Sequence, residues 1–248
     1  MNRLGTVLIA AAVWTVSVSA HGADVLVACA ANFTPTLERI ATRFESETRH
    51  SVRISTGSTG TLYAKIRNGA PYDIFLAADI ERPRRLEREG TAVAGTRFTY
   101  AIGRLVLWAP GQQAVGPATL SRARPHRLAI ANPKTAPYGR AARETLRALG
   151  MWEALAPRIV RGENVAQAFQ YVASGAAPMG FVALSQVRQH EGAGNAYWIV
   201  PQDRHTRLEQ QAVVLEPGRA NAGARALWAF LRGETARTII AEAGYDAP

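Results

Sequence analysis

The chain has 248 residues, of which 48% are hydrophobic and 19% charged, and its formal net charge is +10. These proportions are typical of a folded protein and exclude an intrinsically disordered chain. A single cysteine excludes both an intramolecular disulfide framework and a cysteine-rich zinc module. Because Lys65 and Lys134 are the only lysines, arginine supplies nearly all of the positive charge. Codon bias produces such a preference, so the basic balance says little about partners.

The N-terminus is predicted to be a secretory signal peptide. Arg3 precedes an apolar stretch, 4–18, which is followed by the small residues Ser19 and Ala20. A short positive segment, an apolar segment and a small-residue site are the three parts of such a peptide. We therefore expect residues 1–20 to be removed, with cleavage after Ala23 as the alternative, and the mature chain to be secreted.

The mature chain is predicted to alternate strands with helices, because short apolar runs alternate with segments of helical periodicity. The predicted strands are 24–30, 51–56, 72–77, 98–108, 128–131, 180–183, 195–200 and 210–215. The first predicted helix begins at Thr34-Pro35, with Thr34 as its N-cap, and another follows 136–139 and ends at 149. The other predicted helices are 61–68, 82–89, 163–174, 221–232 and 234–243.

Strand–helix units on both sides of the long strand 98–108 predict an α/β protein with two lobes. We expect residues 24–100 to form the first part of lobe 1, and residues 101–210 to form lobe 2 with the crossover strands. Residues 211–248 then return to lobe 1 and add the closing helices. Two crossings between two lobes would form a hinge over a cleft.

Four predicted helices begin with small or polar segments, at 32–35, 57–60, 136–139 and 162–165. The first N–H groups of a helix have no partner inside the helix, and they lie at the positive end of its dipole. Such groups bind anions without a cation, and in α/β sheets these loops lie at the strand ends where ligands bind. Ordinary capping explains any one of these loops. Their presence in both predicted lobes favours an anion site.

Patterns typical of enzymes are weak in this sequence. The segment 57–60 lacks the residue that separates glycine from serine in a Gly-x-Ser-x-Gly nucleophile elbow. The five histidines stand apart, and none forms a metal-binding pair at helical spacing. We therefore expect no catalytic residues, no bound metal cation and no cofactor. The arginines form no stripe with interleaved aromatics, so we also expect no nucleic-acid partner.

Several ordered motifs resemble one known family across essentially the whole mature chain. The motifs are 28–34 (ACAANFT), 55–62 (STGSTGTL), 68–79 (NGAPYDIFLAAD), 131–133 (ANP), 136–139 (APYG) and 177–182 (APMGFV). Together they are similar to the periplasmic molybdate-binding proteins of ABC importers. The resemblance implies the two-lobed type II periplasmic binding fold, in which each lobe is a mixed sheet flanked by helices and the ligand cleft lies between the lobes.

The resemblance also implies that the ligand, molybdate or tungstate, is held by neutral hydrogen-bond donors. Carried over motif by motif, the ligand-binding residues are Ala31 through its backbone, Asn32, Ser58, Thr59, Tyr138, and Val165 through its backbone N–H.

Two positions depart from the pattern of the family. Many members have a tyrosine after the Gly-x-Val strand, where this chain has Ala183. Tyr138 stands where a small residue is common, and its hydroxyl could replace the missing one. Asn32 stands where many members have serine.

The function that the resemblance implies is the capture of molybdate or tungstate and its delivery to an ABC permease in the inner membrane, by a monomeric protein that is not an enzyme. The alternatives are a binding protein for another tetrahedral oxyanion, such as sulfate, or a secreted serine hydrolase that uses Ser58. An exported sensor with the same fold is a third possibility.

Overall fold

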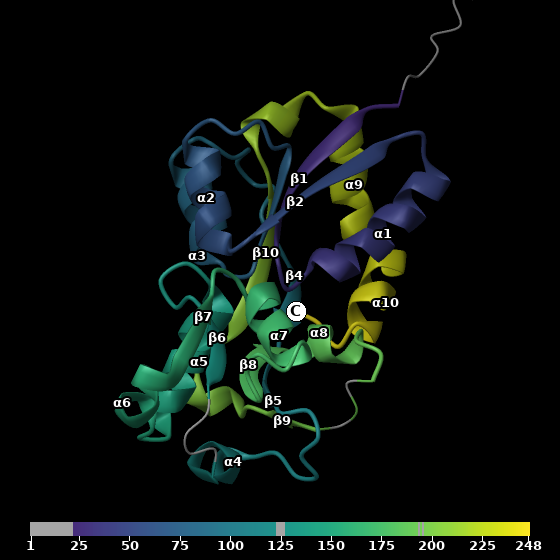
Figure 1. Cartoon of the computed structure of the whole chain (residues 1–248). Helices are drawn as coiled ribbons and strands as arrows, with labels where there is room; N and C mark the ends of the chain where they lie inside the picture. The colour runs from purple at the N-terminus through teal and green to yellow at the C-terminus, as the bar shows by residue number, and fades with distance from the viewer. Residues whose placement is uncertain (1–21, 123–126, 193, 195) are drawn as a thin grey trace, which may run out of the picture.

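The computed structural model describes residues 22–122, 127–192, 194 and 196–248, which form two α/β lobes (Figure 1). The predicted signal peptide, 1–20, and Asn195, the expected start of a strand, lie outside the described residues. In Figure 1 the lobe that contains β1 and β2 lies above the lobe that contains β5 to β9. No helix within the described ranges is long and apolar enough to cross a membrane.

The first lobe is a five-stranded mixed sheet with helices on both faces. The sheet order is β2-β1-β3-β10-β4, in which β1 is parallel to β2 and β3, and β10 is antiparallel to β3 and β4. The strands are β1 (Asp24–Ala30), β2 (Ser51–Gly57), β3 (Ile74–Ala77), β4 (Phe98–Gly103) and β10 (Leu208–Val214). The helices are α1 (Thr34–Glu47), α2 (Thr59–Arg67), α3 (Glu81–Arg88), α9 (Ala222–Leu231) and α10 (Glu234–Glu242), with a 3-10 turn at Glu216–Arg219.

The pattern of apolar residues in the first lobe explains how its strands and helices pack. Val27 and Ala28 in β1 face opposite sides of the sheet, and neither is exposed. A strand covered on both faces reads as a continuous apolar run, which is how β1 appears in the sequence. Leu37, Ile40 and Phe44 form one stripe along α1 and pack into the core with α9 and α10.

The second lobe repeats the same plan. Its sheet order is β7-β6-β8-β5-β9, in which β6 is parallel to β7 and β8, and β5 is antiparallel to β8 and β9. The strands are β5 (Leu105–Trp108), β6 (Leu128–Ala131), β7 (Ile159–Gly162), β8 (Met179–Ala183) and β9 (Tyr197–Ile199). The helices are α4 (Pro117–Arg122), α5 (Pro137–Ala148), α6 (Trp152–Leu155), α7 (Val165–Ala173) and α8 (Leu184–Arg188), with 3-10 turns at Ala156–Arg158 and Gln202–Arg204. The predicted fold class, two lobes with mixed sheets flanked by helices, is confirmed.

The prediction of one long strand over residues 98–108 is wrong. The run is divided at Arg104, so that β4 belongs to the first sheet and β5 to the second. Only glycine fits at position 103, just before the division, because a Cβ there would clash with the hydroxyl of Tyr138. The chain returns to the first sheet between Ile199 and Leu208. Residues 101–103 and 208–210, which we assigned to lobe 2, therefore pair within the first sheet.

Three helix starts differ from expectation. Thr34 does not cap α1: its hydroxyl lies 2.7 Å from that of Thr56, and Phe33 precedes the helix. Helix α2 begins at Thr59 rather than at 61, because Ser58 accepts a hydrogen bond from the N–H of Thr61 and serves as the N-cap. Helix α7 begins at Val165 rather than at 163, with Asn164 as its cap.

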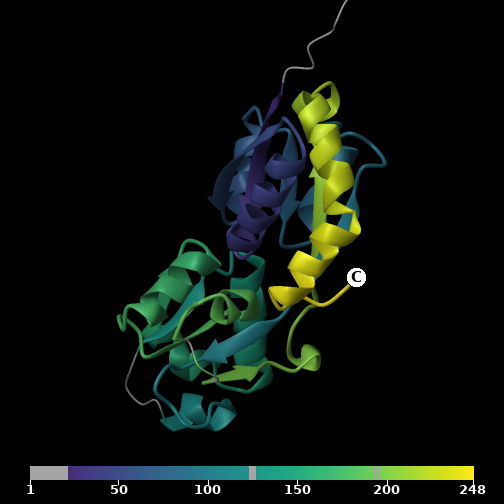
Figure 2. The ribbon, with the colours of Figure 1, turned by 90° about the vertical axis from the view of Figure 1, so that its right-hand side faces the viewer.

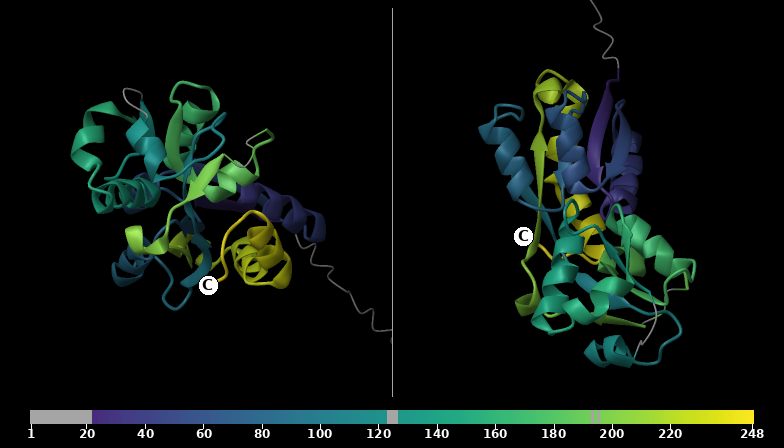
Figure 3. Two further views of the ribbon diagram at one scale, coloured as in Figure 1. Left: turned by 90° about the horizontal axis from the view of Figure 1, so that it is seen from below. Right: turned by 60° about the vertical axis from the view of Figure 1, so that its left-hand side comes forward.

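The C-terminal residues lie at the junction of the lobes. Figure 2 shows α9 and α10 running along the first lobe, with the chain end beside the junction. Asp246 pairs with Ile102 in a short antiparallel bridge. In the right-hand view of Figure 3, β10 runs along the first lobe and down to the second. Two connections and the C-terminal segment thus meet where the lobes join.

Candidate functional site

A small cavity lies between the two lobes. Its lining residues are Ala30, Ala31, Asn32, Gly57, Ser58, Thr59, Ala78, Ala136, Pro137, Tyr138, Asn164 and Val165. All six residues that the sequence suggests as ligand-binding are among them. The lining also includes Asn164, which lies in a predicted loop but was not among the six.

The sheet topology explains why these segments meet. In the first lobe, β1 and β2 are parallel, and each leads at its carboxyl end into a lining loop and then a helix. In the second lobe, the parallel strands β6 and β7 lead in the same way into α5 and α7. The carboxyl ends of parallel strands share one edge of a sheet, where α/β proteins bind ligands. The cavity lies where these two edges face each other.

Five backbone N–H groups of buried lining residues donate to no protein acceptor within the described ranges. They belong to Asn32, Ser58, Thr59, Tyr138 and Val165, whose residues are between 1% and 5% exposed. Four of them lie at the N-termini of α2, α5 and α7, where helical geometry provides no partner. Unpaired N–H groups that are removed from water, at the positive ends of helices, suit a negatively charged ligand.

The hydroxyl of Ser58 is also available to a ligand. Its Oγ accepts from the N–H of Thr61 at 3.2 Å and lies 2.7 Å from the Thr61 hydroxyl. If the Thr61 hydroxyl donates in that pair, the proton of Ser58 is free for a ligand. The hydroxyl oxygen of Thr59 accepts from the N–H of Ala78 at 3.0 Å, which leaves its own proton free as well.

At the first loop, the available donor differs from the expected ones. The N–H of Ala31 donates to the carbonyl of Gly57 at 3.0 Å. The side-chain amide of Asn32 donates to Gln210 Oε1 at 2.8 Å and to the hydroxyl of Tyr245 at 3.1 Å. The donor of this loop that has no protein partner is therefore the backbone N–H of Asn32.

The backbone N–H and the side-chain hydroxyl of Tyr138 lie in different surroundings. Its N–H lies in the first turn of α5, next to the cavity. Its hydroxyl lies 3.5 Å from Gln210 Nε2 and against Gly103, both in strands that join the lobes. Ala183 is buried, its N–H donates to Gln186, and it does not line the cavity. Burial raises the pKa of Tyr138 well above its usual value, so the phenol stays neutral.

None of the lining residues in the described part of the chain carries a formal charge. Arg82 lies close to Gly60 beside the second loop, but it forms an ion pair with the buried carboxylate of Asp79. The site therefore offers dipoles and hydrogen-bond donors rather than a cation. A buried anion held in this way is neutralised by many partial charges at short range.

The described histidines lie apart from Ser58. The ring of His50 accepts from the N–H of Ala23, His205 contacts the carbonyl of Thr206, and His190 packs against Trp108 and Phe169. None of them lines the cavity. A serine nucleophile needs a base within hydrogen-bond reach, so the serine hydrolase alternative finds no such histidine in this part of the chain. The described residues also contain no group of three potential metal ligands.

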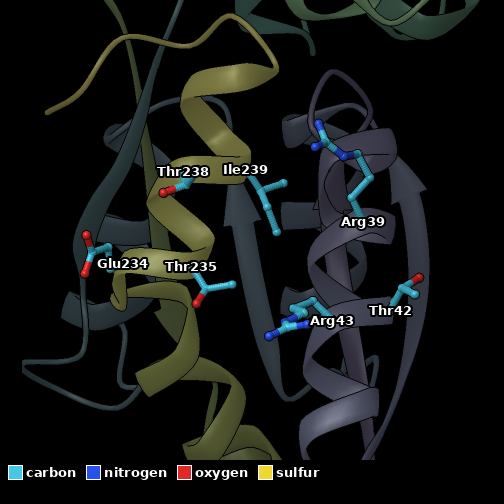
Figure 4. A pocket seen from close by; sticks show the side chains of 7 residues that line it. All are labelled: Arg39, Thr42, Arg43, Glu234, Thr235, Thr238 and Ile239. Carbon is cyan, nitrogen blue, oxygen red and sulfur yellow. The ribbon is translucent and has the colours of Figure 1, made fainter.

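A second hollow lies on the surface between α1 and α10, and Figure 4 shows its side chains. Its two arginines already have partners: Arg39 pairs with Glu242 at 2.6 Å, and Arg43 pairs with Glu47 at 2.5 Å. It belongs to one lobe only, and the carboxylate of Glu234, in the first turn of α10, adds a negative charge to its lining, which opposes binding of an anion. The cavity between the lobes is thus the better candidate for a ligand.

Comparison with known proteins supports this assignment. The molybdate-binding protein ModA of Azotobacter vinelandii is 46% identical over 98% of this chain and 97% of its own length. ModA of Rhodobacter capsulatus is 42% identical over 95% and 93%. The solved structure of the periplasmic molybdate-binding protein of Azotobacter vinelandii matches with a TM-score of 0.85 and 41% identity, over 90% of this chain and 99% of that one. A family model described as bacterial extracellular solute-binding protein matches residues 25–246. The chain belongs to the family of bacterial extracellular solute-binding proteins.

Proposed function

We propose that this protein captures molybdate or tungstate in the periplasm and delivers it to the membrane permease of an ABC importer. The names of the two relatives more than 40% identical over nearly their whole length support the ligand. The predicted signal peptide at 1–20 supports export, and the family supports a carrier role without covalent chemistry. The protein acts as a monomer that presents its loaded, closed form to the permease.

The observation that carries the proposal is the set of five unpaired N–H groups around one small uncharged cavity. The N–H groups of Asn32, Ser58, Thr59, Tyr138 and Val165, with the Ser58 hydroxyl, would bind the oxygens of the anion. Ala31 would contribute to the wall of the site. Hydrogen bonds to a charged group are worth about 1.5–3 kcal/mol each, so several together offset the loss of hydration of a dianion.

The same donors distinguish between oxyanions by protonation state. Backbone N–H groups can only donate, so an anion without a proton satisfies them best. Hydrogen phosphate keeps a proton near neutral pH and needs an acceptor that free N–H groups do not provide. Sulfate has no such proton, and only its smaller radius separates it from molybdate. Sulfate is therefore the competing ligand.

Titration calorimetry of the mature chain with molybdate, tungstate, sulfate and phosphate tests this proposal. We expect molybdate and tungstate to bind most tightly, sulfate more weakly and phosphate not at all. If sulfate binds most tightly, the proposed ligand changes to sulfate and the proposed site stands. Absence of heat with all four anions would overturn the proposed function. Labelling of Ser58 by a fluorophosphonate probe would instead favour the hydrolase.

A further inference from the structure

A buried hydrogen-bonded cluster lies directly behind the first loop of the cavity, and Tyr245 is at its centre. Tyr245 stands three residues before the C-terminus, yet it is only 4% exposed. Its ring packs edge-on against Phe33, with 5.5 Å between the ring centroids. The C-terminal segment, whose end lies at the junction in Figure 2, therefore places a side chain in the interior.

The hydroxyl of Tyr245 both donates and accepts. It donates to the carbonyl of Asn32 at 2.8 Å. It accepts from Asn32 Nδ2 at 3.1 Å and from the hydroxyl of Ser185 at 2.9 Å. A phenolic hydroxyl has one proton to donate and lone pairs with which to accept. These three contacts satisfy the hydroxyl. Two of them hold Asn32, one at its backbone carbonyl and one at its side-chain amide.

The same contacts join the two lobes. Asn32 belongs to the β1–α1 loop of the first lobe, whereas Ser185 belongs to α8 of the second. The Ser185 hydroxyl also lies 3.3 Å from the Asn32 carbonyl, and both residues are buried. Gln189, the C-cap residue of the same helix, donates to the hydroxyl of Thr36 in α1 at 3.3 Å. Separation of the lobes by hinge rotation would break the bonds of Ser185, while Tyr245 and Asn32 would stay together.

The segment that carries Tyr245 is tied to the first connection between the lobes. The backbone of Asp246 exchanges two 3.0 Å hydrogen bonds with Ile102, the next-to-last residue of β4. The carboxylate of Asp246 accepts from Arg104 Nε at 2.7 Å. Arg104 is the residue at which the chain passes from one sheet to the other. Tyr245 is thus anchored beside the point about which the lobes would turn.

We propose that Tyr245 and Ser185 form a latch that stabilises the closed arrangement of the lobes and holds Asn32 in position for the anion. The inference rests on the proposed function for its ligand. Neither residue lines the cavity, so both are positioning residues. The latch links closure to the loop that provides the Asn32 N–H, so that loss of the latch speeds ligand release.

The test compares Tyr245→Phe and Ser185→Ala with Tyr100→Phe. Tyr100 is a matched control because it is also 4% exposed and also packs on Phe33, but its hydroxyl contacts only Ala77 and Gln210. We expect molybdate to dissociate about three- to tenfold faster from Tyr245→Phe and Ser185→Ala, as for the loss of one buried hydrogen bond. Tyr100→Phe should lower the melting temperature but keep the wild-type dissociation rate.

The double variant provides a second readout. Because one hydrogen bond joins Tyr245 to Ser185, the effect of both substitutions on the dissociation rate should be smaller than the product of the two separate effects. Wild-type dissociation rates in both single variants would overturn the latch. An equal acceleration in Tyr100→Phe would also overturn it, because the effect would then belong to the buried cluster as a whole.

A ligand-free measurement separates the latch from the proposed function. Spin labels at Arg88→Cys in α3 and Glu153→Cys in α6 report the distance between the lobes, since both positions are exposed. Burial raises the pKa of Cys29 to about 12, so the native thiol does not react with the label. If the wild type binds none of the four anions, the proposed function fails. The latch then predicts a closed population in the ligand-free wild type that falls in Ser185→Ala but not in Tyr100→Phe, and equal distributions would overturn it.

Discussion

Ser58 and Tyr138 differ in what their hydroxyls can offer an anion. The Ser58 hydroxyl lies at a helix N-terminus that lines the cavity, whereas that of Tyr138 faces Gln210 in a connecting strand. We expect Ser58→Ala to weaken molybdate binding about tenfold to hundredfold, the effect of about 1.5–3 kcal/mol. We expect Tyr138→Phe to change it less than about threefold. Titration calorimetry of both variants measures this.

Asn221→Ala serves as the control for Ser58→Ala, since it also removes an N-cap, at α9, away from the cavity. It should lower stability by about 0.5–2 kcal/mol, as Ser58→Ala does through capping, without loss of affinity. A large effect of Tyr138→Phe with little effect of Ser58→Ala would reverse the assignment. It would restore the interpretation in which the tyrosine hydroxyl replaces the one missing at Ala183.

Among the described residues that line the cavity, Tyr138 is also the only one with a titratable side chain. Burial raises its pKa well above its usual value of about 10. A raised tyrosine pKa extends the neutral form to higher pH, so any loss of binding from its ionisation would occur only above that value. We therefore expect molybdate affinity to be constant between about pH 6 and pH 9. A transition with a midpoint near pH 6.5 would instead indicate a histidine in the site.

At the scale of elements, the start of α2 fits closely against the second lobe. The N–H of Gly60 donates to the carbonyl of Thr135 at 2.8 Å, and a Cβ at Gly60 would lie 2.8 Å from that oxygen. Gly60→Ala should weaken molybdate binding about tenfold or more, because the lobes could no longer close. It should not lower the melting temperature of the ligand-free protein, because alanine favours a helix by about 0.5–1 kcal/mol over glycine. Calorimetry and thermal melting measure the two effects.

Gly116→Ala is the matched control, since a Cβ at Gly116 meets nothing within 4 Å. It should leave the affinity unchanged. Wild-type affinity in Gly60→Ala would show that the contact with Thr135 is not needed for binding.

The sequence predicts an element well where a single apolar pattern or a single capping residue determines it. The apolar run of β1 and the cap of α9 at Asn221 are examples, and both elements lie where expected. The division at Arg104 is not visible in the sequence, because β4 and β5 are both buried and read as one apolar run. Short elements such as β7, four residues long, carry too little periodicity to be recognised.

The same limit applies to the site. Motifs before helices point to the lining loops, because the chemistry lies within a few neighbouring residues. The partners of Asn32 are Gln210 and Tyr245, which are 178 and 213 residues away in the chain. No local pattern marks such contacts. Sequence reasoning therefore leads to the loops and misses which donor of each loop is free.

At the scale of the whole molecule, the lobes are in contact beside the cavity. Gly60 bonds to Thr135, and Arg140 lies 3.6 Å from Glu81 of α3. Since each lobe supplies part of the anion site, the ligand should favour this closed form over an open one. Small-angle scattering should show a smaller radius of gyration on addition of molybdate to the wild type and no change in Gly60→Ala. An unchanged wild-type radius would contradict closure driven by the ligand.

The most direct test of the account is a crystal structure of the mature protein with molybdate, in which anomalous scattering locates the molybdenum. We expect one strong peak in the cavity between the lobes, with the anion oxygens about 2.7–3.2 Å from the backbone nitrogens of Asn32, Ser58, Tyr138 and Val165. A peak beside arginine side chains on the surface, such as those in Figure 4, would contradict a site built from neutral donors. A crystal structure with no molybdenum between the lobes would contradict it as well.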